Sequence, residues 1–327
     1  MNRFHWIRHT LSLALGMLPF AAAQAQAQAW PTQPVRIVVP FNAGGITDNL
    51  ARILGKGIAD ATGKTVIVEN KPGAGGNLGS ALVAKSPPDG HTLLVSAPGN
   101  FAINQFMYKS MPYSPEKDLT PITVIGQTPM VLVVHPSVPA RSVAELVALA
   151  KSQPGKLNAS SGGNGSTSHL SLELFKMMAG VDIVHVPYNG AAPARRDLLG
   201  GQVQMAINDM GTFMGDIRGG TLRVLATGTQ QPSRFLPGIP TLAESGLPGY
   251  ASTGWYALAA PSGTPKPVLD AMSATVMRVL NEPEIRKTIE SAGVDVGGES
   301  IDKTGQFVAT EAAKWKKAVQ ASGATIE

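Results

Sequence analysis

Four short segments of the chain combine glycine with hydroxyl or amide side chains directly after an apolar run, where a strand would end. They are Pro40–Asp48 (PFNAGGITD), Ser96–Asn100 (SAPGN), Ser160–Leu170 (SSGGNGSTSHL) and Val186–Leu198 (VPYNGAAPARRDL). Where such a turn leads into a helix, it presents backbone N–H groups to an anion. These residue types therefore indicate that the chain holds a carboxylate or a phosphate.

The first segment follows the apolar run Val35–Val39 and leads into a predicted helix. Gly44 and Gly45 have no Cβ, so a ligand can approach the main chain closely. The N–H groups of the first helical turn also carry the positive end of the helix dipole. Asp48 would repel an anion, so capping the helix is the more ordinary role for it, although ligand contact stays open.

The second and third segments offer side-chain donors on a flexible backbone. Ser96 and Asn100 could contact a ligand or simply form a turn. Ser160–Leu170 contains five hydroxyl residues and three glycines, whereas capping a helix needs only one or two of them. The surplus indicates a cradle for a carboxylate or phosphate, beside which His169 is either a positive charge or an ordinary hydrogen-bonding residue.

The fourth segment offers the hydroxyl of Tyr188 on a rigid ring and a turn at Asn189-Gly190. Arg195 and Arg196 follow in the first turn of the next helix, where arginine side chains ordinarily point to solvent. A fifth, shorter segment, INDMG, places Asp209 at a strand end.

Motifs for catalysis are weak or absent. Gly57–Thr65 resembles a P-loop, but it has five residues between its glycines and lies between a helix and a strand in the wrong order. Gly73–Gly79 is a weak dinucleotide motif. Ser166, His169 and Asp209 can be drawn as a hydrolytic triad, but their spacing does not favour one. The six histidines show no metal-ligand spacing, so we expect neither a cofactor nor a metal.

Short β-branched runs alternate with helical patterns, which predicts an α/β protein with a mostly parallel sheet and helices on both faces. The predicted strands are Val35–Val39, Thr65–Val68, Thr92–Ser96, Met130–His135, Ile183–Val186, Gln204–Ile207, Arg223–Thr227 and Trp255–Ala259. The predicted helices are Asp48–Ala61, Leu78–Lys85, Val143–Lys151, Leu170–Met178, Ala194–Leu199, Met214–Arg218, Pro265–Leu280, Pro283–Ala292 and Thr304–Ser322. Ligands of such sheets bind at the carboxyl ends of the strands, where the glycine-rich segments lie.

Two long extended stretches, Ile122–Pro136 and Tyr250–Pro265, bracket a block of strand–helix units. We interpret them as paired crossovers between two lobes. The first lobe would contain residues 30–125 and 251–327, and the second lobe residues 126–250.

The N-terminus predicts export. A basic start, an apolar centre from Leu11 to Ala23 and small residues in A-x-A spacing form a signal peptide over residues 1–29, with cleavage after Ala27 or Ala29. The apolar centre is shorter than the roughly 20 residues of a membrane-spanning helix. We therefore expect a soluble protein of the periplasm.

Composition excludes several classes of partner and site. The chain has 327 residues, of which 43% are apolar, so it can build a substantial core. Its formal charge of +5 includes Arg3 and Arg8 of the predicted signal peptide, which contains no acids, so the mature chain carries +3. With no dense basic cluster we expect no nucleic-acid partner. The absence of cysteine excludes disulfides and thiol nucleophiles.

The chain resembles the Bug or TctC-like family of periplasmic solute-binding proteins, the receptors of tripartite tricarboxylate transporters. The matching stretches are WPTQPVRIVVPFNAGGITD, VIVENKPGAGGNLGSALVAKSPPDGHTLL, GGNGSTSHLSLELFKMMAG, VPYNGAAPARRDLLGGQV and PGIPTLAESGLPGY. They run in this order from residue 30 onward. The resemblance implies a two-lobed type II periplasmic-binding-protein fold with a central cleft that closes on a carboxylate.

The resemblance also implies the binding residues and the partners. By position, it assigns ligand contacts to Phe41, Ala43, Gly44, Gly45 and Asp48 of one lobe and to Ser161, Gly163, Ser166, His169, Tyr188, Asn189, Gly190 and Asp209 of the other. The family often has a basic residue where this chain has Asn189, so a charge contact from that position is in doubt. The implied partners are a small organic carboxylate and, transiently, membrane transporter subunits, with the receptor itself a monomer.

Two enzymatic functions remain open as alternatives to the receptor function. An exported serine hydrolase would use Ser166 and His169 and would lose ester or amide turnover in the Ser166→Ala variant. An oxidoreductase would bind a nicotinamide cofactor at Gly73–Gly79, which export disfavours because such cofactors are scarce outside the cytoplasm.

Overall fold

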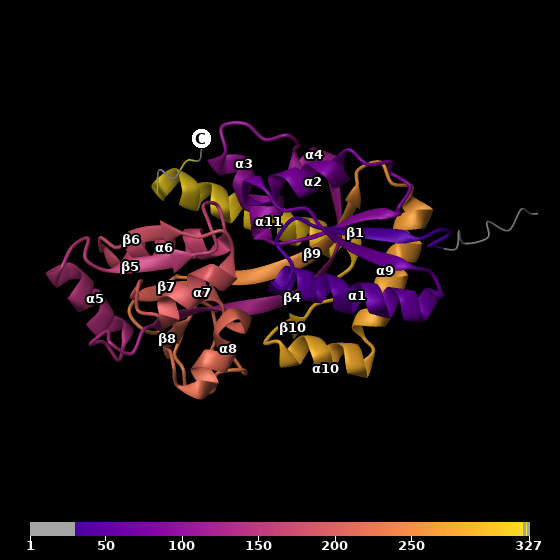
Figure 1. The fold of residues 1–327 in the computed structure, drawn as a ribbon. Coiled ribbons are helices and arrows are strands. Elements are labelled where there is room, and N and C mark those ends of the chain that lie inside the picture. Colours follow the sequence, from indigo (N-terminus) through magenta and orange to yellow (C-terminus); the bar gives the residue numbers. More distant parts are fainter. Residues whose placement is uncertain (1–29, 323–324, 326–327) are drawn as a thin grey trace, which may run out of the picture.

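The computed structural model describes residues 30–322 and 325 as a two-lobed α/β molecule (Figure 1). The predicted signal peptide, residues 1–29, lies outside the described residues. Within the described part, no helix is both long and apolar enough to cross a membrane.

The first lobe is built on the strand order β2-β1-β3-β9. Its strands are β1 (Val35–Val39), β2 (Val66–Asn70), β3 (Thr92–Ser96) and β9 (Thr253–Pro261). β1 pairs in parallel with β2 and β3, and β9 runs antiparallel to β3. Its longer helices are α1 (Ile46–Thr62), α2 (Asn77–Ala84), α9 (Lys266–Leu280), α10 (Pro283–Ser291) and α11 (Ile301–Ser322), and its short ones are η1 (Ala74–Gly76), η2 (Gly99–Ile103), α3 (Asn104–Met107) and α4 (Pro115–Asp118).

Helices cover both faces of this sheet, which explains why β1 is apolar throughout. Ile37 and Val39 belong to one core cluster together with residues of α1 and α9, whereas Val38 belongs to a second cluster together with residues of α2 and α11. A strand buried on both faces is read as a continuous apolar run and not as an alternating one.

The second lobe repeats this construction around three parallel strands in the order β7-β5-β6. Its strands are β5 (Asn158–Ser161), β6 (Val184–Pro187), β7 (Met205–Asp209) and β8 (Arg223–Thr227), and its helices are α5 (Val143–Ser152), α6 (Thr167–Ala179), α7 (Ala191–Leu199) and α8 (Met210–Gly219). Two more core clusters lie on the two faces of this sheet.

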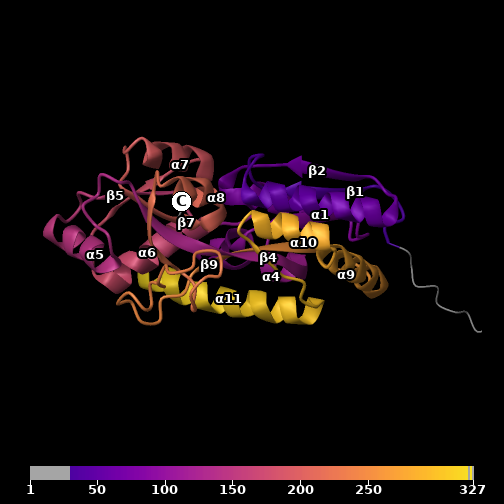
Figure 2. The same cartoon turned by 90° about the horizontal axis from the view of Figure 1, so that it is seen from below.

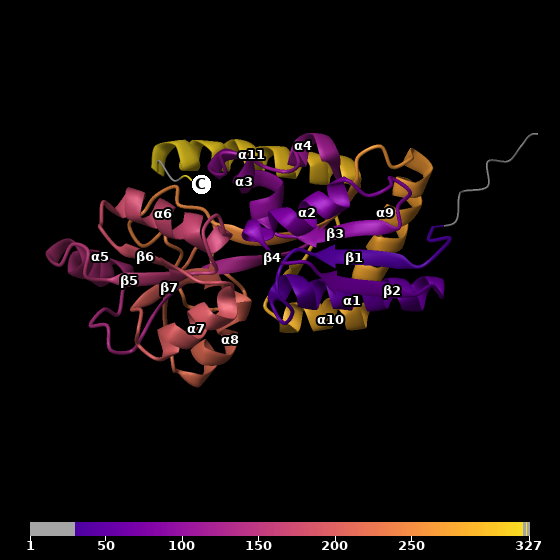
Figure 3. The same ribbon diagram turned by 45° about the horizontal axis from the view of Figure 1, so that its top comes forward.

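One strand joins the lobes. β4 (Leu119–Val134) pairs antiparallel with β9 over residues 119–129 and then with β7 and β8 over residues 130–134. The short strand β10 (Asp295–Val296) also pairs with β4, at Gly126 and Gln127. The two stretches predicted as crossovers are therefore one antiparallel pair running along the long axis of the molecule (Figure 3).

Most elements predicted from the sequence are present. β1, β3 and β8 have the predicted bounds, and all nine predicted helices form. Helix α5 begins with a capping bond from the Glu145 amide to the Ser142 hydroxyl, at 3.2 Å. The expectation of a mostly parallel sheet holds within each lobe but is wrong for β4, which is antiparallel to all four of its partners. The sequence missed β5 and β10, because Asn158–Ser161 reads as a polar turn and Asp295–Val296 is only two residues long.

Helix α11 lies along the molecule beneath β4 and β9 (Figure 2) and is held by one carboxylate. Glu311 accepts hydrogen bonds on Oε2 from the indole nitrogens of Trp255, at 2.9 Å, and Trp315, at 3.1 Å. Both indoles are buried, and Lys314 pairs with the other carboxylate oxygen. Helix α11 is thereby fixed to β9, the strand that pairs with β4.

We expect the Glu311→Ala variant to unfold with a free energy about 3 kcal/mol below that of the wild type, because two buried indole N–H groups lose their acceptor. Glu311→Gln keeps one acceptor oxygen and should lose less than half of that amount. Urea denaturation measures both. Glu284→Ala, at an exposed position of α10, is the control and should change the free energy of unfolding by less than about 0.5 kcal/mol. Equal effects of the alanine variants at 311 and 284 would contradict the anchoring role.

Candidate functional site

The loops that follow β1, β5, β6 and β7 lie at the junction of the two lobes (Figure 3). Two close approaches between the lobes define this junction. A Cβ at Gly99 would lie 3.4 Å from the carbonyl oxygen of Gly165, and a Cβ at Gly211 would lie 3.9 Å from Cδ1 of Ile46. The carboxyl ends of the strands of the two lobes therefore face each other, as expected for a ligand site in an open α/β sheet.

The loop after β1 leaves the start of α1 open. Gly45 is the N-cap residue and no side chain caps the helix. Ala43, Gly44 and Gly45 are exposed, and Gly44 has a φ of +87°, a conformation that glycine adopts without strain. Phe41 is half-buried against the core beneath. An uncapped helix start on an exposed glycine turn is the backbone arrangement that favours an anion.

Asp48 lies below this loop and is not the N-cap residue. Its side chain is 3% exposed and accepts hydrogen bonds from the Gly44 amide at 2.9 Å, from Arg52 Nε at 3.0 Å and from Asn70 Nδ2 at 3.0 Å. Burial raises the pKa of Asp48, but the bonds from Arg52, Gly44 and Asn70 together outweigh burial, so the net pKa lies below its ordinary value. Because its carboxylate oxygens already accept hydrogen bonds from the protein, Asp48 holds the loop in place from beneath.

Ser96 and Asn100 form a second buried brace in the first lobe. Both side chains are fully buried, and the Ser96 hydroxyl donates to Asn100 Oδ1 at 2.7 Å. Asn100 Nδ2 in turn donates to the Gly75 carbonyl at 3.1 Å and to Asn77 Oδ1 at 3.2 Å. The pair therefore fastens the loop after β2 and exposes no side-chain surface to a ligand in this conformation.

Hydrogen bonds of its own serine hydroxyls to main-chain groups hold the loop between β5 and α6 in shape. Ser166 is the N-cap of α6, accepting from the His169 amide at 3.3 Å and donating to the Gly163 carbonyl at 2.6 Å. The Gly162 amide donates to Ser168 Oγ at 2.9 Å. Gly163 has a φ of +126°, and a Cβ there would lie 2.9 Å from the carbonyl oxygen of Tyr188. The loop thus packs directly against the turn after β6.

Two histidine rings support this loop. His169 and His185 stack with their ring centroids 4.0 Å apart and an interplanar angle of 11°. His169 Nδ1 accepts from the Gly165 amide at 3.2 Å, and His185 Nε2 lies 2.6 Å from Ser161 Oγ. Burial lowers the pKa of each ring to about 4, so both rings are neutral near pH 7. His169 therefore contributes no positive charge to the site.

The turn after β6 is bonded to the loop after β5 through its main chain. The Tyr188 amide donates to the Ser161 carbonyl and the Gly190 amide to the Gly162 carbonyl, each at 3.1 Å. Gly190 is the N-cap residue of α7, again without a side-chain cap, and Asn189 is exposed. α7 therefore offers a second uncapped helix start at the junction.

The side chains around this turn serve structural roles. The Tyr188 hydroxyl donates to Asp197 at 2.9 Å. Burial, together with this bond to the Asp197 carboxylate, raises the pKa of Tyr188. The expectation that Arg195 simply points to solvent is wrong, because its guanidinium binds both carboxylate oxygens of Asp216, at 2.5 and 2.6 Å.

Asp209 lies at the end of β7, beside the strand pair that joins the lobes. Its Oδ1 is buried and has no well-aligned hydrogen-bond partner among the described residues, and a Cβ at Gly254 would lie 2.1 Å from it. Burial raises the pKa of Asp209 to about 6, although the nearby Tyr256 hydroxyl acts in the opposite direction. The carboxyl group therefore lies against β9, inside the junction.

The structure gives no support to either of the two enzymatic interpretations. Asp209 packs on Gly254, while the His169 ring bonds to Gly165 and stacks on His185, so no Ser–His–Asp relay joins Ser166, His169 and Asp209 in the described residues. In the weak dinucleotide motif, a Cβ at Gly76 would lie 2.6 Å from Asn100, and Gly75 is covered in the same way by Tyr108. Side chains therefore occupy the space that a cofactor would need.

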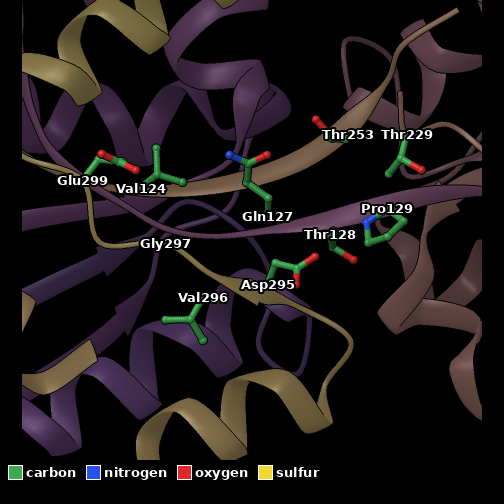
Figure 4. A pocket seen from close by; sticks show the side chains of 10 residues that line it. All are labelled: Val124, Gln127, Thr128, Pro129, Thr229, Thr253, Asp295, Val296, Gly297 and Glu299. Carbon is green, nitrogen blue, oxygen red and sulfur yellow. The ribbon is translucent and has the colours of Figure 1, made fainter. Parts of the chain in front are cut away.

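Sequence reasoning missed a cavity at the junction of the lobes (Figure 4). Its volume is about 320 Å³, and it is lined by Val124, Gln127, Thr128, Pro129, Thr229, Thr253, Asp295, Val296, Gly297 and Glu299. Both acidic side chains already have basic partners, since Arg234 lies 2.7 Å from Asp295 and Lys303 lies 3.5 Å from Glu299. No group of three metal-ligating side chains occurs anywhere in residues 30–322.

The sequence also missed the partners Arg52, Asn70, Asn77 and His185, which support these loops. None of them lies in the four segments singled out as binding loops, although Asn77 belongs to the weak dinucleotide motif Gly73–Gly79. Only the parallel register of β5 and β6, in which Ala159 pairs with His185, places that histidine beneath the Ser161 loop.

Comparison with known proteins agrees with this geometry. Residues 50–324 match the model of the tripartite tricarboxylate transporter family receptor, TctC. BugT of Bordetella pertussis is 35% identical over 307 residues, covering 94% of each chain. The solved structure of R. palustris Rpa4515 with adipate is 38% identical, has a TM-score of 0.86 and covers 91% of this chain and 100% of that one. MatC of Rhodopseudomonas palustris, solved with bound malate, is 31% identical with a TM-score of 0.83 over 89% of this chain and 100% of that one.

The fold is that of the periplasmic binding proteins of the Bug and TctC type. The chain belongs to the tripartite tricarboxylate transporter receptor family, whose members are solute-binding receptors.

Proposed function

We propose that this protein is a periplasmic receptor that holds a small organic carboxylate between its lobes and leaves it chemically unchanged. The observation that carries the proposal is the uncapped start of α1 at Gly45, which faces the loops of the second lobe. Relatives of the same fold were solved with adipate and with malate, both of which are carboxylates.

Uncharged groups do the binding in this proposal. The segments 40–48, 160–170 and 186–190 contain no lysine or arginine. Backbone amides and hydroxyls can bind a carboxylate by charge-assisted hydrogen bonds without burying an opposite charge. Excluding water between the lobes strengthens those bonds, because the local dielectric constant falls.

The proposed ligand contacts belong to the loops at the junction of the lobes, and Ser161 and His169 among them are buried in this conformation. In the first lobe they are the main chain of residues 43–46, with Phe41 as a wall. In the second lobe they are Ser161, Gly163, Ser166, His169, Tyr188, Asn189 and Gly190, chiefly through amides and hydroxyls. Asp48, Ser96 and Asn100 position these loops from beneath, and Asp209 lies at the back of the site.

A change in the relative position of the two lobes would distinguish the ligand-bound receptor from the free one. We place the boundary so that residues 30–125 and 251–327 form one lobe and residues 126–250 the other, with β4 and β9 as the connection. A ligand that contacts both lobes shifts the equilibrium toward the closed form in proportion to its better affinity for that form. Transient membrane subunits would recognise the closed form of a monomer exported by the N-terminal signal peptide.

Protein unfolded and refolded to remove co-purified ligand should bind adipate or malate saturably at a single site. Isothermal titration calorimetry measures the affinity, and adipamide, the uncharged diamide, is the matched control that should not bind. The ligand recovered afterwards should be intact by NMR, since no reaction is expected. Absence of binding across a broad carboxylate panel, or recovery of a converted product, would overturn the proposal.

The Gly163→Ala variant should weaken carboxylate binding about tenfold or more, because the new Cβ adopts a disfavoured φ and meets the Tyr188 carbonyl. Gly180→Ala is the control at the end of α6. It also has a positive φ, +61°, but no atom lies within 4 Å of its Cβ position. It should lower stability by about 1 kcal/mol and leave the affinity unchanged. If the two variants bind carboxylate with similar affinities, the 161–169 loop is not part of the site.

The Asp48→Asn variant should lose about 2 kcal/mol of unfolding free energy at pH 7, because a buried charged acceptor is replaced. The folded pKa of Asp48 is lowered, so its stabilisation is present above the unfolded value near 3.9 and disappears as the pH falls through the folded pKa. The stability difference between variant and wild type should therefore shrink below about pH 4. Urea denaturation at several pH values measures this.

Asp60→Asn removes the same charge from the exposed end of α1, where Asp60 pairs with Lys56. It should change stability by less than about 0.5 kcal/mol at any pH. Only Asp48→Asn should also weaken carboxylate binding, by about tenfold, because it frees the Gly44 amide. A pH-independent stability loss in Asp48→Asn would argue against the brace.

A further inference from the structure

We infer that His185 is a positioning residue of the carboxylate site, whose ring holds Ser161 directly and holds the Gly165 amide through its stack on His169. The inference rests on the proposed function of the 161–169 loop. His185 itself lies on β6, outside every glycine-rich segment, and contacts the loop only from beneath.

Ser161 and His185 share a short hydrogen bond. Ser161 Oγ lies 2.6 Å from His185 Nε2, accepts from the Gly163 amide at 3.1 Å and lies 3.3 Å from the Gly163 carbonyl oxygen. The chain Gly163–Ser161–His185 thereby fixes the first half of the loop to β6.

The second half of the loop is fixed by the partner ring. His169 Nδ1 accepts from the Gly165 amide at 3.2 Å, and the His169 ring lies parallel to that of His185 at 4.0 Å. Neither ring can tilt without displacing the other. The two rings therefore determine the direction in which the loop amides between Ser161 and Gly165 point.

The bond from the Gly165 amide requires a neutral His169 ring. A doubly protonated imidazole has no lone pair left, so it cannot accept from that amide. The charged groups that face the pair are Glu173 and Lys176 of α6, which bind each other at 2.8 Å. Burial lowers the pKa of both rings to about 4. The loop should keep one shape above about pH 5 and lose it in acid.

Three variants separate the roles of the ring. His185→Gln keeps a hydrogen-bonding group near the Nε2 position and cannot be protonated, His185→Phe keeps a stacking ring without a hydrogen-bonding nitrogen, and Ser161→Ala removes the hydroxyl. With adipate or malate as the probe, His185→Phe and Ser161→Ala should each weaken binding about tenfold, and the double variant should weaken it no further. His185→Gln should remain within about threefold of the wild type.

His135 is the matched control, because its ring also bonds a serine, Ser137, at 2.7 Å, but at an exposed position. His135→Phe should leave the affinity unchanged. Wild-type affinity of His185→Phe, or fully additive losses in the double variant, would overturn the inference.

NMR of the ligand-free protein tests the same inference without any ligand. In the wild type, the Gly165 amide resonance should move with a midpoint near pH 4, together with the two histidine rings. In His185→Gln this change should follow His169 alone. If the Gly165 resonance does not respond to either ring, the positioning role is wrong even where carboxylates bind. If the resonance responds but no carboxylate binds, the proposed function fails while the coupling of the rings to the loop stands.

Discussion

The hydrogen bonding of β4, first to β9 and then to β7 and β8, is the constraint on which the rest of the molecule depends. A single strand of 16 residues belongs to both lobes, so the sheet of one continues into the sheet of the other. This continuity makes the carboxyl ends of two separate sets of parallel strands face each other. Without it, the loops after β1, β5, β6 and β7 would be unrelated; with it, they lie at one junction between the lobes. β4 and β9 are also the connections that any relative movement of the lobes must bend.

The loops at the junction must let a ligand approach the main chain and must also keep a fixed conformation. Buried polar groups supply the second requirement. Glycine lets a ligand approach the main chain, but a glycine-rich loop loses much conformational entropy when it is ordered. Each loop is accordingly fastened from below: the loop after β1 by Asp48, the loop after β2 by Asn100 and the loop after β5 by His185. These hydrogen bonds engage main-chain groups of the loops, so they hold each loop in one conformation.

Sequence patterns predicted the elements and the glycine-rich turn before α1, because both are encoded locally. Apolar periodicity predicted β1, β3 and the helices, and the structure shows the glycine turn leading into the uncapped start of α1. The braces were not predictable in the same way. Asp48 reads equally well as a helix cap, and its role depends on Arg52 and on Asn70, which is 22 residues away. His185 pairs with Ser161 only through the register of two parallel strands, and no local pattern reports that register.

The absence of basic residues from segments 40–48, 160–170 and 186–190 would give the distribution of charge a functional meaning if these segments hold the ligand as proposed. The first arginines that follow them in sequence, Arg52 and Arg195, are paired with Asp48 and Asp216, and the two histidines beneath the second-lobe loop are neutral. A bound carboxylate would therefore meet dipoles of fixed direction and not a mobile opposite charge. Dipoles discriminate by geometry, since a hydrogen bond weakens steeply as its angle departs from linearity. Selectivity among organic acids would then follow from the spacing between the amides at Gly45 and those of the second lobe, a distance that movement about β4 and β9 adjusts.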